Sequence, residues 1–192
     1  MIFNKLLDTP QIGILYFFFK VANRDQKAND VLRILLRQIL EQLREPPAEV
    51  YAQYNKCQNS LHKSALTRRV YTTLFICCVE EFFNRYSNGV FILLDAYDEF
   101  KPEKEEERQR EELLSSLREI SSTGSTRLLI TTRPQYGNVL QNKFKEVEVV
   151  EITTDHEDVE IYLNREMEHI PLNSFLKNDI KNAILSEAKE LL

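Results

Sequence analysis

Glycine is scarce in this chain, with only four among 192 residues. Loops that cradle phosphate groups need glycine, because its missing side chain lets the backbone approach the ligand. The usual phosphate-binding pattern of nucleotidases, G-x-x-x-x-G-K-[S/T], occurs nowhere in the sequence. We therefore expect no complete phosphate-binding loop of this type.

Cysteine is also rare, and its spacing argues against a disulfide framework or a zinc site. The three residues, Cys57, Cys77 and Cys78, are odd in number and form no C-x-x-C pair. We expect all three to be reduced thiols, with the adjacent pair inside a helix.

Long hydrophobic runs are absent as well. The apolar segment Ile12–Phe19 is far too short to cross a bilayer, and no signal-peptide pattern is visible at the N-terminus. The formal net charge of -5 argues against the nucleic-acid backbone as a main partner. We expect a cytoplasmic protein that binds neither membranes nor nucleic acid.

What the chain does have is an alternation of apolar runs and helical periodicity. Buried strands are expected at Ile12–Phe19, Val90–Leu94, Arg127–Thr132 and Val147–Ile152. Helices are expected near residues 31–43, 70–82, 101–120, 159–167 and 180–191, while 50–64 fits a short helix or a loop. Strands separated by helices favour parallel pairing, so the predicted class is α/β.

Three acids follow the most apolar of these strands. Asp95 comes directly after Val90–Leu94, and Asp98 and Glu99 follow within one short turn. Ligands of open α/β sheets bind at the carboxyl ends of strands, where a carboxylate suits Mg²⁺. We therefore predict Asp95 as a metal ligand. Asp98 and Glu99 are predicted as catalytic carboxylates that orient or deprotonate a water. The alternative is a hydrophilic turn that merely ends a strand.

An arginine occupies the equivalent place after the next strand. Arg133 follows the segment that ends in Thr131 and Thr132. Its guanidinium can meet phosphate oxygens, and the threonine hydroxyls can contact phosphate or bound water. Arg133 and Thr132 are therefore predicted to bind a phosphate-containing cofactor. The alternative is a surface arginine in a turn.

Taken in order, these segments resemble the NACHT domain of STAND-class P-loop NTPases. The closest likeness is to fungal NLR-like proteins and to the nephrocystin-like N-terminal domain found with ankyrin or WD repeats. The segments that carry the resemblance are Tyr16–Phe19, Leu36–Leu40, Phe91–Glu99, Leu129–Pro134 and Asp158–Leu163. The resemblance implies a three-layer, mostly parallel sheet, a Walker B element with Asp95 on magnesium, and Arg133 as the sensor arginine.

The chain also departs from this family pattern. The phosphate loop and its strand should precede Tyr16, but the few residues there include Met1–Leu7, which reads as the tail of a first helix. We expect residues 1–153 to form a partial nucleotide-binding core and residues 154–192 to begin a helical region. In this family the missing first strand would lie between the strands expected at Arg127–Thr132 and Val147–Ile152. Without it, the facing backbone groups of these two strands have no partners unless the two strands pair with each other.

The expected function is therefore part of a nucleotide-dependent signalling switch without its own NTP hydrolysis. The intact parent would bind Mg²⁺ and ATP or GTP, whereas this chain alone is expected to bind no cofactor. Self-association, or contact with a signalling partner, would occur through flanking domains. One alternative is a protein-interaction scaffold that binds no nucleotide. Another is a magnesium-dependent phosphoesterase using Asp95, Asp98 and Glu99, although further metal ligands for a two-metal site are missing.

Overall fold

The computed structural model describes residues 12–22, 26–59, 66–101, 105–144, 146–152 and 156–191. The chain divides into two compact units, Met1–Val147 and Glu148–Leu192. Each unit is described by itself below. The tail of a first helix expected at Met1–Leu7 lies outside the described residues.

The first unit contains a parallel sheet of three strands in the order β1-β2-β3. The strands are β1 (Gly13–Phe18), β2 (Val90–Asp95) and β3 (Thr126–Ile130). They pair in register from their first residues onward, so their carboxyl termini lie side by side at the same end of the sheet. The predicted α/β class and the parallel pairing are confirmed, and the Val90–Leu94 strand lies in the middle of the sheet.

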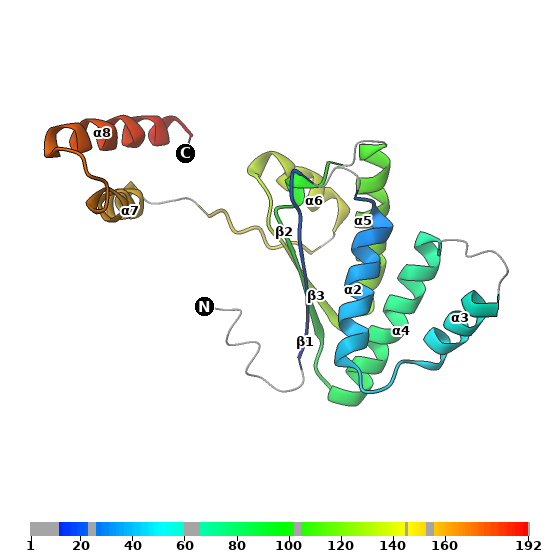
Figure 1. Cartoon of the computed structure of the whole chain (residues 1–192). Helices are drawn as coiled ribbons and strands as arrows, with labels where there is room; N and C mark the ends of the chain where they lie inside the picture. The colour runs from blue at the N-terminus through cyan, green and yellow to red at the C-terminus, as the bar shows by residue number, and fades with distance from the viewer. Residues whose placement is uncertain are drawn as a thin grey trace. The chain divides into compact units, whose positions relative to one another are not determined.

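Three long helices cover one face of this sheet (Figure 1). They are α2 (Ala28–Gln42), α4 (Arg68–Tyr86) and α5 (Glu106–Ser121). The segment predicted as helix or loop forms α3 (Ala48–Asn59), which contacts α4. Helix α5 begins later than the expected start near residue 101, and residues 102–104 lie outside the described part.

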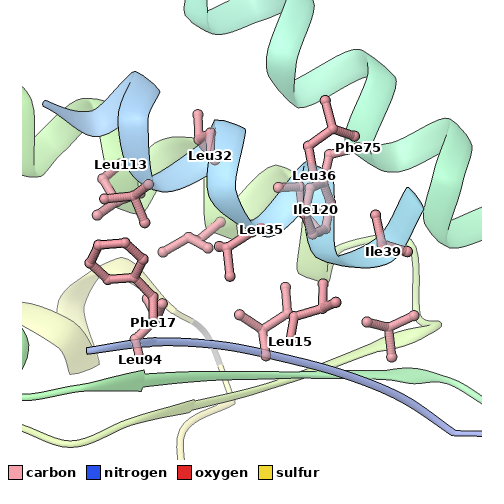
Figure 2. Close-up of a cluster of buried hydrophobic side chains, with 14 of the residues drawn as sticks. Leu15, Phe17, Leu32, Leu35, Leu36, Ile39, Phe75, Leu94, Leu113 and Ile120 are labelled. Carbon is pink, nitrogen blue, oxygen red and sulfur yellow. The ribbon is translucent and has the colours of Figure 1, made fainter. Parts of the chain in front are cut away.

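The core lies between the sheet and these helices (Figure 2). Apolar residues on α2 recur every three or four positions, so they form one stripe that faces the strands. Every second residue of β1 and β2 points into the same core, since alternate side chains of a strand share a face. The fully buried core residues include Leu15, Leu32, Leu35, Ile39, Ile92, Leu94, Leu113 and Ile120. Burying each such side chain contributes about 1.5–3 kcal/mol.

The opposite face of the sheet has no helical cover among the described residues of this unit. Phe18 is 50% exposed and Leu129 61% exposed, and Tyr16 lies beside Phe18 with ring centroids 5.5 Å apart. The described residues of this unit thus form two layers. The second helical layer implied by the expected three-layer sheet is not among them.

The outer edge of β1 is closed by two glutamines of α2. Gln38 accepts from the N–H of Tyr16 at 2.8 Å and donates to its carbonyl oxygen at 2.9 Å. Gln42 does the same for Ile14, at 3.2 and 2.9 Å. The spacings match, because four helical residues rise about 6.0 Å and two strand residues about 6.6 Å. Each amide thereby occupies the place of a neighbouring strand.

The strand predicted at Val147–Ile152 is wrong. These residues form no strand in the described part of the chain, and Val150 and Ile152 are 73% and 88% exposed. The alternation of valine and glutamate favours an extended chain, but a strand also needs a neighbour for its backbone hydrogen bonds. The segment does not close on β3 either, so β3 has no strand partner on its outer side among the described residues.

The second unit holds two helices, α7 (His156–Glu168) and α8 (Ser174–Leu191), which contact each other. Lys181 on α8 donates to Glu160 on α7 at 2.6 Å. Both helices are predicted from periodicity and confirmed. Thr154 and Asp155, either of which is a residue type that favours the N-cap of such a helix, lie outside the described residues. None of the described helices has the length and apolar character needed to span a membrane.

Candidate functional site

The predicted site residues emerge together at the carboxyl ends of β2 and β3. Leu94 lies opposite Ile130 in the sheet, so the segments that follow them leave side by side. The chain after β2 enters a short 3-10 helix, η1 (Tyr97–Glu99), and the chain after β3 runs through Thr131 to Arg133. A second 3-10 helix, η2 (Pro134–Tyr136), and the short α6 (Gly137–Lys143) follow.

Asp95, the predicted magnesium ligand, is the last residue of β2. Its Oδ1 accepts a hydrogen bond from the hydroxyl of Thr131 at 2.5 Å. Its Oδ2 has no partner among the described residues. One carboxylate oxygen is therefore held by the protein, and the other makes no hydrogen bond to a described residue.

The turn that follows Asp95 has an uncommon backbone. Ala96 adopts the left-handed conformation, with φ 55° and ψ 49°. A non-glycine residue there costs roughly 1–3 kcal/mol, so other contacts must hold it. Two bonds to Thr131 do so, because the N–H of Ala96 donates to its Oγ1 and the N–H of Tyr97 to its carbonyl oxygen, both at 2.9 Å. The turn directs the chain into η1.

The predicted catalytic acids meet the predicted phosphate-binding arginine. Asp98, whose side chain is only 9% exposed, accepts from Nε of Arg133 at 3.0 Å and from its backbone N–H at 3.3 Å. Glu99 lies 3.6 Å from Nη2 of the same guanidinium. Its other oxygen, Oε2, is buried and has no hydrogen-bond partner among the described residues. The structure thus brings these three residues together and pairs them with one another.

This pairing offsets part of the negative charge at the site, because one guanidinium faces two carboxylates. Each oxygen of Asp98 accepts one hydrogen bond from Arg133, so the arginine holds the carboxylate in this arrangement. The guanidinium of Arg133 remains 66% exposed and can reach solvent on its outer side. Because water screens so exposed a group, the ion pair contributes little stability, about 0–1 kcal/mol.

The two threonines after β3 differ in their contacts. Thr131 is committed to the protein through its backbone and its hydroxyl. The hydroxyl of Thr132, predicted to contact a cofactor, is buried and has no partner among the described residues. Thr132 therefore carries an unused donor and acceptor next to Arg133.

Arg110 is a residue of this region that sequence reasoning missed. It lies on α5 among charged residues that favour a solvent-exposed helix face, yet its side chain is mostly buried. It donates to the carbonyl oxygens of Phe100 at 2.7 Å and Asp98 at 3.3 Å. Its guanidinium also lies 5.8 Å from the ring of Tyr97 and 4.8 Å from that of Tyr136. Arg110 thereby fixes the backbone of η1 from the helix side.

Tyr97 anchors η1 in the core. It is 1% exposed and stacks edge-on against Phe19. Burial raises the pKa of its phenol, while the nearby Arg110 opposes this shift to a smaller degree. The hydroxyl has no hydrogen-bond partner among the described residues, so Tyr97 acts here through its ring.

The metal prediction rests on Asp95 alone. No group of three or more His, Cys, Asp or Glu side chains that could hold a metal lies within the described part of the chain. Magnesium often takes only one or two carboxylates, with phosphate oxygens and water completing its shell. The open oxygen of Asp95 fits that kind of site, whereas a two-metal phosphoesterase gains no support.

The comparison with protein families bears on this arrangement. A family model described as nephrocystin 3, N-terminal, matches residues 1–133, which is more than half of the chain. The chain belongs to this family. The match includes the three strands of this nephrocystin 3 N-terminal domain and every predicted site residue, and it confirms the nephrocystin-like part of the resemblance. No curated protein matches the chain.

Proposed function

We propose that this chain is part of a nucleotide-dependent signalling switch of the NACHT, STAND-class type. The observation that carries the proposal is the pairing of two strand ends. Asp95 at the end of the central strand keeps one carboxylate oxygen open, and Arg133 leaves the neighbouring strand beside it. A cation site and a guanidinium at one edge of a parallel sheet suit a metal-bound phosphate ligand.

The sheet supports a relationship to P-loop NTPases. The strand that bears Asp95 is the middle one, and β3 has no strand on its outer side among the described residues. That edge is where the resemblance places the strand that would carry the phosphate loop. A nucleotidase fold without this strand accounts for the unpaired edge and for the exposed Val147–Ile152 segment.

Each site residue has a proposed task. Asp95 holds Mg²⁺ directly or through water, and Arg133 and Thr132 face the phosphates. Asp98 and Glu99 form the distal acidic pair, which Arg133 holds in the present arrangement. Bound Mg²⁺ with ATP or GTP would supply charge neutralisation of the phosphates in the intact parent. This chain lacks the glycine and lysine loop, so we propose that it is not an NTPase by itself.

Equilibrium binding and turnover test the proposal together. Fluorescent ATP, ADP and GTP are titrated into the chain with Mg²⁺, and phosphate release is followed in parallel. Although no resident cofactor is expected for this chain alone, Asp95 should still allow weak, magnesium-dependent binding at millimolar nucleotide. We expect Asp95→Asn to remove this binding, and we expect no turnover. Glu41→Gln on the far surface of α2 is the control. Turnover that Asp95→Asn abolishes would overturn the non-enzymatic assignment, and no binding at millimolar nucleotide would overturn the switch.

The second candidate is a protein-interaction scaffold that binds no nucleotide. It is favoured by the uncovered sheet face, where Tyr16, Phe18 and Leu129 are exposed together. Contiguous apolar patches on a protein surface mark interaction sites. The absence of nucleotide binding in the titration above, for a chain that unfolds cooperatively, would support this function instead.

A further inference from the structure

We propose that Thr131 is the positioning residue of this site, the group that sets the direction of the Asp95 carboxylate and holds the turn behind it. The proposal rests on the proposed function for the meaning of Asp95 as a cation ligand. Its evidence is the set of contacts that Thr131 makes with the strand exit of β2. Sequence reasoning treats Thr131 only as a further hydroxyl for phosphate or water.

Thr131 is bonded to four successive residues of the neighbouring chain segment. Its N–H donates to the carbonyl oxygen of Leu94, and its own carbonyl oxygen accepts from Tyr97, both at 2.9 Å. Between these two backbone bonds, its hydroxyl contacts Asp95 and Ala96. The whole passage from strand to 3-10 helix is therefore tied to the residue that directly follows β3.

The hydroxyl performs two tasks with one oxygen. It donates its proton to Oδ1 of Asp95 at 2.5 Å and accepts the N–H of Ala96 at 2.9 Å. A hydroxyl has one donor and two acceptor positions, so both bonds form at the same time. Donation to one carboxylate oxygen leaves the other as the ligand and fixes its direction. Valine has the shape of threonine but can do neither task.

The second bond links Asp95 to the acids that follow. Ala96 is held in the left-handed conformation by this bond and by the backbone contact to Tyr97. That conformation determines where η1 begins and hence where Asp98 and Glu99 lie. Loss of the hydroxyl is therefore expected to disturb the cation ligand and the turn together.

Two substitutions and a matched control test this role. Thr131→Val removes both hydroxyl bonds, and Thr131→Ser retains them. Thr126→Val makes the same chemical change at the start of β3, where the buried hydroxyl has no partner among the described residues. The probes are Mn²⁺ affinity, measured by electron paramagnetic resonance on the whole chain, and hydrogen exchange of the Ala96 amide.

Thr131→Val is expected to weaken Mn²⁺ binding about 10–100-fold, as changes to the partners of metal ligands do. It should also speed exchange at Ala96, while Thr131→Ser and Thr126→Val behave as wild type. Unchanged Mn²⁺ affinity and unchanged exchange in Thr131→Val would overturn the positioning role. If the wild type binds no Mn²⁺, the proposed function fails, and the exchange rates alone decide whether Thr131 holds the turn.

Discussion

The two glutamines at the edge of β1 allow a sharp test of how this fold is held together. We expect the double variant Gln38→Ala with Gln42→Ala to be less stable than wild type and to self-associate. Alanine keeps the helix but removes both side-chain amides, so the N–H and carbonyl groups of Ile14 and Tyr16 lose their partners. Water can replace them, but so can the strand of another molecule.

The size of the effect follows from four hydrogen bonds. Each contributes about 0.5–1.5 kcal/mol net, which gives about 2–6 kcal/mol in total. The edge is solvent-accessible, so the lower part of this range, about 2–3 kcal/mol, is expected. That is a large share of a total stability of about 5–15 kcal/mol. For a chain of this size it lowers Tm by about 4–12 °C.

Urea unfolding followed by circular dichroism measures the stability, and light scattering after size-exclusion chromatography measures association. Arg37→Ala is the matched control, because it changes the same helix and removes only the exposed pair with Glu41. A double variant that unfolds at the wild-type urea concentration and elutes at the wild-type mass would refute the reasoning. Destabilisation without association would show that solvent alone satisfies the freed edge.

Two further predictions concern the turn before β2 and a buried thiol of α4. Gly89→Ala should lower the free energy of unfolding by about 1–3 kcal/mol, since its new Cβ would lie 2.6 Å from the carbonyl oxygen of Ser125. Gly137→Ala is the control, because nothing lies within 4 Å of its new Cβ and the protein should keep its stability. Equal urea midpoints for the two variants would contradict this prediction. Burial raises the pKa of the Cys78 thiol to about 12. Between about pH 9 and 12 only the unfolded chain releases that proton, so this thiol should lower the free energy of unfolding by up to about 1.4 kcal/mol per pH unit. In urea titrations Cys78→Ala should reduce the slope by this amount and keep the part that the raised pKa of Tyr97 contributes.

The fold was predictable where one local pattern determines one structure. The run Val90–Leu94 is too apolar to be exposed and too short for a helix, so a buried strand was the natural reading. The periodicity of α2 was equally clear. The prediction of a strand at Val147–Ile152 failed because the alternation of valine and glutamate indicates a preference for extended backbone, and not the presence of a neighbouring strand. The role of Gln38 and Gln42 gives no local signal, since it depends on how α2 lies along β1.

The site was predictable in position but not in pairing. Parallel strands in register bring Asp95 and Arg133 to one edge, and this follows from the sequence. Which side chain bonds to which depends on the left-handed turn at Ala96, which no pattern of residue types predicts. The inward direction of Arg110 likewise depends on the packing of α5, because charged residues surround it in the sequence.

The occupied edge of β1 determines on which side a further strand can join the sheet. A fourth strand could join at β1 only by displacing both glutamine amides, while β3 offers backbone groups that no described residue uses. Whatever segment extends the sheet, from this polypeptide or another, will therefore run alongside β3. A strand that joins parallel to β3 would place its last residues next to Thr132 and Arg133. It would therefore change the shape of the region in which a ligand is expected.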